Sequence, residues 1–199
     1  LKIQFSPSIL VDLVKDSFGN VGILQSLLLR LVDDYAEIPE TQPQLVQITD
    51  RSLYKKAAVD YAAQLDGTYQ QFARSVSNGI RKRKRSTGIY AHALRIILEA
   101  PDNEMISGLS RNAIFVVAHE REPRIQTGNL RTVLQKLDSL QVDSAYRGLV
   151  VSYDESTDSV FVVDRQLLFY RKHHTMNWPW EEMIEECEQL SLFEADYSL

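Results

Sequence analysis

Apolar side chains recur at helical spacing through the first forty residues. Ser6-Pro7 is a helix start, with Ser as the N-cap and Pro at the first helical position. Four apolar residues then fall on one helical face: Ile9, Leu10, Leu13 and Val14. Gly19 can take the left-handed conformation that ends a helix, and a second helix is expected over residues 22–37. The pattern predicts a helical hairpin that is too short to be stable unless it packs on something else.

The middle of the chain is predicted to be a helical connector. Residues 37–43 contain two prolines and are expected to form a loop. A helix should follow from residue 50 or 52 to about residue 65, where Asp66-Gly67 is expected to break it. A further helix is expected over residues 68–77.

From residue 87 onward the pattern changes to helices followed by strands. Helices are expected over residues 87–100, over residues 107–120, and from Thr127 or Asn129 to residue 140. Residues 148–153 and 160–163 alternate like strands on either side of a polar turn. Three helices followed by a β-hairpin is the order of a winged helix. The expected fold class is therefore mainly α with a small β-hairpin, a helical lid-like region followed by a winged-helix domain.

This pattern divides the chain into four expected parts. They are a lid-like hairpin (1–40), a helical connector with a basic run (41–86), a winged-helix domain (87–175) and an acidic C-terminal helix or tail (176–199).

Composition places the chain among ordinary globular proteins. Hydrophobic residues make up 44% and charged residues 25% of the 199 residues. There is no apolar run of about 18 residues, which argues against a membrane span. The single cysteine, Cys187, favours a reducing compartment, so the expected location is cytoplasmic. Because Leu1 is not Met, we interpret the chain as the C-terminal part of a longer protein, with a trimmed start as the alternative.

Charge is concentrated at two places. One run is entirely basic: Arg81, Lys82, Arg83, Lys84 and Arg85. From Glu181 onward the chain has seven acidic residues and no Lys or Arg, and the net charge is −5. Five successive cations cannot be buried together, so the run indicates a local anion-binding patch that could contact nucleic-acid phosphates. A solubilising run, or a docking site for an acidic partner, is the alternative.

Two stretches carry a resemblance to a known family. The segment from Phe5-Ser6-Pro7 to the Gly19-Asn20-Val21-Gly22 joint resembles the helical lid of AAA+ and STAND-type P-loop ATPases. Residues 130–140 running into 147–151, and then 163–171, resemble the winged helix at the C-terminal end of many of these proteins. The resemblance implies that ATP and Mg²⁺ would be bound by an N-terminal core outside this chain. It also implies that a protein with such a core would form oligomers. Initiator ATPases often carry an Arg just after the joint, whereas the nearest here is Arg30. A direct contribution of the lid to ATP chemistry is therefore not expected.

No catalytic or metal site is predicted in the chain itself. It contains no phosphate-binding loop, so it cannot hydrolyse ATP unaided. His119 lacks the second His of a zinc helix, and the adjacent His173 and His174 should point to different sides of a helix. Cys187 lies between two glutamates, which makes it a poor nucleophile.

The third helix of the winged-helix region supplies the binding candidates. Four of its residues can hydrogen-bond bases or phosphates in a DNA groove, with Thr132 and Gln135 beside them: Thr127, Asn129, Arg131 and Lys136. The hairpin turn, however, carries Asp154, Glu155 and Asp158, which would repel a phosphate backbone. The sequence therefore leaves double-stranded DNA and a protein partner both open. We expect the chain to be a C-terminal regulatory region of a P-loop ATPase, or alternatively a stand-alone interaction adaptor.

Overall fold

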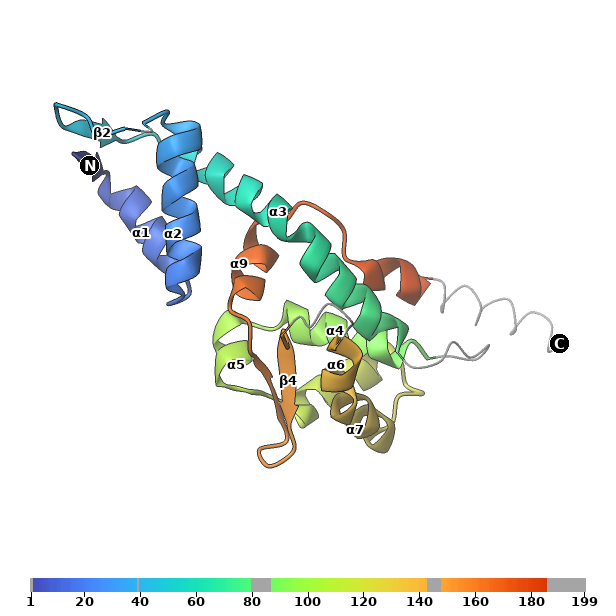
Figure 1. The fold of residues 1–199 in the computed structure, drawn as a ribbon. Helices are drawn as coiled ribbons and strands as arrows, with labels where there is room; N and C mark the ends of the chain where they lie inside the picture. Colours follow the sequence, from blue (N-terminus) through green and yellow to red (C-terminus); the bar gives the residue numbers. More distant parts are fainter. Residues whose placement is uncertain (1, 39, 80–86, 143–147, 186–199) are drawn as a thin grey trace. The chain divides into compact units, whose positions relative to one another are not determined.

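The computed structural model describes residues 2–38, 40–79, 87–142 and 148–185 (Figure 1). Over these residues the chain is mainly helical and contains two small β-sheets, which confirms the expected class at that level. Packing separates two compact units. Unit 1 comprises Leu1–Gly67 and Arg165–Met176, and unit 2 comprises Thr68–Asp164 and Asn177–Leu199. In the described part of the chain, no helix combines the length and the apolar character needed to cross a bilayer.

Unit 1 is built around a helical hairpin and a longer helix. Its elements in chain order are β1 (Ile3–Phe5), α1 (Pro7–Asp16), α2 (Val21–Leu29), the π-helix η1 (Arg30–Tyr35), β2 (Val46–Ile48), the first part of α3 (Arg51–Asn78) and α9 (Gln166–His173). The predicted second helix is thus present, but its last turns are π-helical and it ends at Tyr35.

Local sequence signals explain the joint between α1 and α2. Pro7 begins α1 and Ser6 occupies the N-cap position, as predicted, but the Ser6 side chain makes no cap hydrogen bond. The chain then turns through Phe18 and Gly19, whose φ angles are 48° and 73°. Asn20 caps α2 because its side-chain oxygen accepts a hydrogen bond from the Gly22 amide at 2.8 Å. The predicted left-handed Gly19 is confirmed, and Phe18 adopts the same conformation without the freedom of a glycine.

The apolar stripe of α1 is only half buried. Ile9 and Leu13 are fully inside the core of unit 1, whereas Leu10 is 46% and Val14 66% exposed. Further core residues come from α2, η1, α3 and α9, among them Ile23, Leu27, Leu31, Tyr54, Ala58, Tyr61, Leu167 and Phe169. The helices α1 and α2 therefore gain their stability from packing on α3 and α9.

The strands β1 and β2 form a two-stranded parallel sheet that the hydrophobic pattern did not reveal. Ile3 pairs with Val46, and Phe5 pairs with Ile48. These four side chains share one face of the pair because alternate residues of a strand point to opposite faces. Gln4 and Gln47 occupy the other face, where their amides hydrogen-bond at 3.2 Å.

The helix α3 runs without interruption from Arg51 to Asn78, so the predicted break at Asp66-Gly67 is wrong. A single exposed glycine disfavours a helix by only about 1 kcal/mol relative to alanine. Buried side chains continue in helical register on both sides of it, at Tyr61 before Gly67 and at Tyr69 and Ala73 after it. Their packing outweighs the glycine.

Unit 2 combines short helices with a three-stranded sheet. Its elements after α3 are α4 (Ile89–Glu99), α5 (Asp102–Ser107), β3 (Leu109–Ser110), α6 (Arg111–Arg121), α7 (Thr127–Gln135), α8 (Leu137–Gln141), β4 (Val151–Asp154) and β5 (Ser159–Val162). The strands are antiparallel in the order β3-β5-β4. The core lies between α4, α6, α7 and the sheet, and its central residues are Leu94, Ile97, Ile114, Leu130, Leu134, Val151 and Val160.

The predicted helix over residues 107–120 in fact begins after a strand. Leu109 pairs with Val160 in the sheet, and the Ser110 hydroxyl then caps α6 by accepting from the Ala113 amide at 3.2 Å. Gly108 precedes this strand with a φ of 109°, and a Cβ atom there would lie 2.7 Å from the Phe161 ring. A two-residue strand leaves too short a pattern to be seen in a sequence.

The predicted third helix is divided in two. Lys136, with φ −95° and ψ −4°, separates α7 from α8. Thr127 and Asn129 were expected to cap this helix, but Gln126 occupies the cap position and makes no side-chain cap bond, so both lie in the first turn. The α8 helix then presents Gln141 to the sheet.

Gln141 joins α8 to β4 through its buried side-chain amide. Its oxygen accepts from the amides of Val150 at 2.9 Å and Val151 at 3.0 Å, and its nitrogen donates to the Val151 carbonyl at 2.8 Å. A fourth bond reaches the Leu137 carbonyl. One side chain therefore satisfies backbone groups that would otherwise be buried without partners.

The packing units differ from the parts expected from the sequence. The expected winged-helix part ended at residue 175, but α9 packs in unit 1. The expected connector ended at residue 86, whereas α3 extends through the boundary at Gly67. Trp180 and Ile184 are only 2% and 5% exposed, so the beginning of the expected acidic tail packs into unit 2.

Candidate functional site

The first candidate site is the exposed surface of α7. Thr127, Asn129 and Arg131 are exposed, and Lys136 lies half-buried just beyond the end of the helix. Thr132 donates from its hydroxyl to the Gly128 carbonyl at 3.1 Å, so this side chain is turned back on its own helix. Four of the binding residues predicted from the sequence therefore lie on or next to one short helix. The other five, Arg81, Lys82, Arg83, Lys84 and Arg85, lie outside the described residues.

The hairpin turn between β4 and β5 reaches the side chains of α7. Gln135 donates to the Glu155 carboxylate at 2.8 Å, and the Arg131 guanidinium lies 3.9 Å from the same carboxylate. Arg131 and Glu155 are both more than half exposed, so the ion pair is weak in water. It nevertheless places a negative charge beside the cation that was expected to face a phosphate.

A second carboxylate of the turn neutralises the first residue of α6. Asp158 accepts three hydrogen bonds from Arg111, at 2.8, 3.0 and 2.7 Å, and a fourth from the Tyr153 hydroxyl at 2.5 Å. The bonds from Arg111 and Tyr153 lower the pKa of Asp158 to about 2. Asp158 adopts a φ of 52°, which these bonds help to hold.

Other arginines of unit 2 are also paired with acids of the same unit. Arg95 and Arg121 both contact Glu99, at 2.8 and 3.1 Å, and Arg124 contacts Glu122 at 2.7 Å. The described surface of unit 2 is therefore a mixed-charge surface rather than a basic one.

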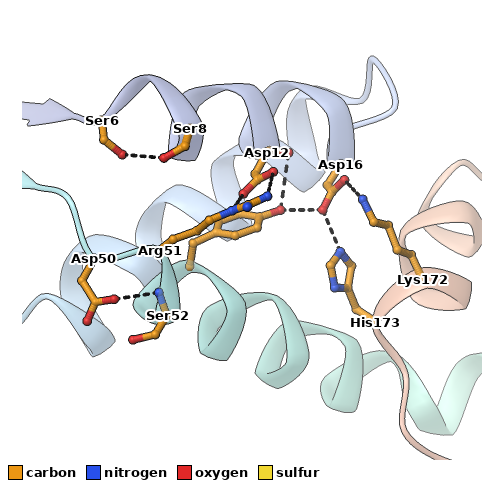
Figure 2. Close-up of polar contacts among 10 residues, drawn as sticks. Ser6, Ser8, Asp12, Asp16, Asp50, Arg51, Ser52, Lys172 and His173 are labelled. Carbon is orange, nitrogen blue, oxygen red and sulfur yellow. Dashed lines mark hydrogen bonds and ion pairs between the residues drawn. The ribbon is translucent and has the colours of Figure 1, made fainter.

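The second candidate site is a buried acidic group in unit 1 that sequence reasoning did not identify (Figure 2). Asp16, at the end of α1, is 2% exposed. It accepts hydrogen bonds from Tyr54 of α3 at 2.6 Å and from Lys172 and His173 of α9 at 2.5 and 2.8 Å. Three helices far apart in the sequence therefore meet at one carboxylate.

The protonation states at Asp16 follow from this geometry. Burial raises the pKa of Asp16, but hydrogen bonds from His173, Lys172 and Tyr54 outweigh it and hold the pKa well below its usual value. Burial and the neighbouring carboxylate raise the pKa of Tyr54 far above its usual value. The tyrosine is thus a hydrogen-bond donor to an ionised Asp16 carboxylate.

One turn earlier, Asp12 makes a parallel contact at the surface. It accepts from Arg51 at 2.5 and 2.8 Å, and these bonds lower the pKa of Asp12. Arg51 is 55% exposed, so this pair is far more hydrated than the one at Asp16 (Figure 2).

Further bonds hold α9 within unit 1. Gln166 donates to the Tyr61 hydroxyl at 3.1 Å, Tyr170 donates to Asp66 at 2.7 Å, and Arg165 donates to the Phe18 carbonyl at 2.9 Å. Together with Asp16, these contacts attach both ends of α9 to helices from the first third of the chain.

The sequence did contain a signal for Asp16. It lies seven residues after Ile9 and three after Leu13, so it continues the buried stripe of α1. A carboxylate on a buried stripe requires a partner. The last turn of α9 contains Lys172 and His173, but their distance in sequence hides the pairing.

The histidines considered as metal ligands have other partners. His119 contacts the Ile125 carbonyl at 2.9 Å, His173 contacts Asp16, and His174 contacts the Met176 carbonyl at 2.8 Å. Within the described ranges, no group of three or more His, Cys, Asp or Glu side chains could hold a metal ion. Cys187 lies outside the described residues.

Arg30, the arginine nearest to the helix joint, is engaged inside unit 1. Its guanidinium lies 4.7 Å over the Tyr61 ring and 3.5 Å from Asp60, and it also donates to Gln64. The side chain is only 17% exposed. It serves to hold η1 against α3.

Comparison of the chain with protein-family models, curated proteins and solved structures finds no match.

Proposed function

We propose that this chain is the C-terminal regulatory region of a P-loop ATPase, in which a helical lid and a winged helix couple the nucleotide state of a core to contact with a partner. The α1–α2 hairpin, with its Gly19-Asn20 joint, supports the assignment of the lid. The engagement of Arg30 with Asp60 and Tyr61 supports a lid that packs rather than one that contacts nucleotide.

The observation that carries the proposal is the arrangement of strands and helices in unit 2. A short strand, β3, lies between α4 and the pair α6–α7, and it pairs with β5 of the hairpin that follows. Apart from the short helices α5, before β3, and α8, before the hairpin, the order of helix, strand, two helices and a hairpin that closes a three-stranded sheet is the arrangement expected of a winged helix. The helix α7 then takes the place of the recognition helix, and residues 155–158 form the tip of the wing.

We further propose that a protein is the partner of this winged helix. A helix that enters a DNA groove needs cations free to meet phosphates. Here Arg131 lies beside Glu155, and Arg111 is held by Asp158. Exposed carboxylates at the tip of the wing would oppose a phosphate backbone at close range.

Double-stranded DNA is the second candidate partner. Thr127 and Asn129 are exposed in the first turn of α7, where groove-reading residues lie in helix-turn-helix proteins. The basic run at residues 81–85 supplies the charge that DNA binding requires.

Fluorescence anisotropy with a labelled DNA duplex tests the choice between these partners. The measurement compares the wild type with a variant in which Arg81, Lys82, Arg83, Lys84 and Arg85 are all replaced by Gln. We expect no binding that depends steeply on salt. Binding that weakens about 10³-fold or more between roughly 50 and 200 mM salt, and that is lost in the variant, would identify DNA as the partner and refute a protein-only contact.

Nucleotide binding by the whole protein tests the ATPase assignment. We expect a fluorescent ATP analogue to bind with Mg²⁺ and to be displaced by unlabelled ATP. If the whole protein binds no nucleotide, the ATPase assignment is wrong and the stand-alone interaction adaptor replaces it.

A further inference from the structure

The hairpin turn between β4 and β5 places one carboxylate beside the exposed face of α7. Arg131 and Gln135 lie one helical turn apart, so their side chains share that face. Gln135 donates to the Glu155 carboxylate at 2.8 Å, and the Arg131 guanidinium lies 3.9 Å from it. Thr127, one turn before Arg131, extends the same exposed stripe. Glu155 therefore lies beside the residues with which α7 would meet a ligand.

The turn that carries Glu155 is held on both sides of this residue. Before it, Asp154 accepts hydrogen bonds from the amide and the hydroxyl of Ser156, at 2.8 and 2.7 Å. An aspartate that bonds the backbone two residues further on is a common way to close a turn. After it, Asp158 is bonded to Arg111 of α6 at 2.7 Å. The position of Glu155 beside α7 is therefore a consequence of the folded turn and not of one side-chain contact alone.

The three carboxylates of the hairpin differ in what they contact. Asp158 is paired with Arg111, and Asp154 is bonded within the turn itself. Glu155 instead contacts α7, and its side chain is 58% exposed, while that of Arg131 is 56% exposed. Glu155 is therefore the carboxylate that a ligand approaching Arg131 from solvent would meet.

The contact between Arg131 and Glu155 matters little for folding but strongly for a charged ligand. An exposed ion pair of this kind contributes little to stability. A phosphate that bonded Arg131 would, however, also come close to the Glu155 carboxylate. Two opposite charges at similar distances from the phosphate act on it with energies of similar size, so the repulsion would cancel most of the attraction. A nucleic acid would therefore gain little from Arg131 while Glu155 is ionised.

We propose that Glu155 is a specificity-determining residue that excludes phosphate backbones from α7 and leaves this surface to a protein partner. This inference rests on the proposed function, since it takes α7 as the contacting helix of a winged helix. It goes further because it assigns the choice of partner to one side chain. Removal of the Glu155 charge should then be sufficient to let α7 contact DNA through Arg131.

Neutralisation of Glu155 in the full chain tests this assignment. Glu155→Gln removes the charge and keeps an oxygen that can accept from Gln135, whereas Glu104→Gln removes the same charge from an exposed position of α5. Fluorescence anisotropy with a labelled DNA duplex measures the affinity of each variant. One further phosphate contact changes the slope of log K against log salt by about 0.9, which is worth about tenfold at roughly 50 mM salt. We expect Glu155→Gln to bind about tenfold more tightly than Glu104→Gln. Equal affinities, or no measurable binding by either variant, would overturn the inference.

A double variant tests whether Glu155 acts through Arg131. If it does, Arg131→Gln should abolish the gain in affinity when it is added to Glu155→Gln. A gain that survives the loss of Arg131 would overturn the inference. The wild type separates this inference from the proposed function. If the wild type does not bind the duplex and Glu155→Gln gains nothing, the inference alone fails and a protein partner remains. Binding by the wild type that depends steeply on salt would refute the protein partner and the exclusion together.

Discussion

Replacing Asp16 by alanine should loosen α9 from unit 1. The substitution leaves the Tyr54 hydroxyl and the His173 ring without the carboxylate that accepts their hydrogen bonds. A hydrogen bond to a charged group contributes about 1.5–3 kcal/mol, but Lys172 is 42% exposed and can be rehydrated. We therefore expect a loss of about 3–6 kcal/mol in the free energy of unfolding, from the two hydrogen bonds to Tyr54 and His173.

Asp12→Ala is the matched control for this experiment. It removes a carboxylate one turn away on the same helix, whose partner Arg51 is largely exposed. Urea denaturation followed by far-ultraviolet circular dichroism gives the free energies, and amide exchange in α9 gives the local effect. If Asp16→Ala has no larger effect than Asp12→Ala, the buried cluster does not anchor α9.

The contribution of Asp16 to stability should also depend on pH. The pKa of Asp16 is lower in the folded chain than its unfolded value of roughly 3.9. A lowered pKa stabilises the fold above the unfolded value, and that stabilisation is lost as the pH falls toward the folded value. Asp16→Asn should therefore be less stable than the wild type at neutral pH and should show a shallower loss of stability below about pH 4. An unchanged acid limb in this variant would contradict the assignment.

Three further predictions concern single positions. Gln141→Leu should destabilise unit 2 by about 2–4 kcal/mol, because the buried amides of Val150 and Val151 lose their acceptor. Urea denaturation followed by the fluorescence of the two tryptophans, both in unit 2, measures this loss. A change below about 1 kcal/mol would argue that water replaces the glutamine. Gly67→Ala should raise stability by up to about 1 kcal/mol, since nothing lies within 4 Å of an added Cβ in the middle of α3, and a lower melting temperature would show that the glycine is needed there. Gly108→Ala should lower the melting temperature by several degrees, because a φ of 109° and the nearby Phe161 ring both oppose a side chain, and an unchanged value would show that this turn relaxes.

The features predicted from the sequence are those with a local cause. Ser6-Pro7 begins α1, Gly19 takes a positive φ, and the strands of the hairpin begin and end within three residues of the expected bounds. Each depends on neighbours within a few residues, so one short window contains the whole signal.

The features that the sequence did not reveal depend on distant partners. β1 pairs with a strand that lies 43 residues further along the chain. Asp16 bonds Lys172 and His173, which follow it by 156 and 157 residues. At α7, the expected residues are present on the surface, but the pairing of Arg131 with Glu155 depends on how the hairpin folds back. A list of exposed cations therefore overstates how basic a surface is.

The return of α9 to unit 1 has a consequence for synthesis on the ribosome. Asp16 is made 156 residues before Lys172, so at about 5–20 residues per second it waits roughly 8–30 s for that partner. All of residues 68–164 are synthesised during this interval. Most of the sequence of unit 2 is therefore made before α9 can complete unit 1. During this interval the nascent α1–α2 hairpin can pack on the first part of α3, but its core side chains and Asp16 lack the partners that α9 supplies.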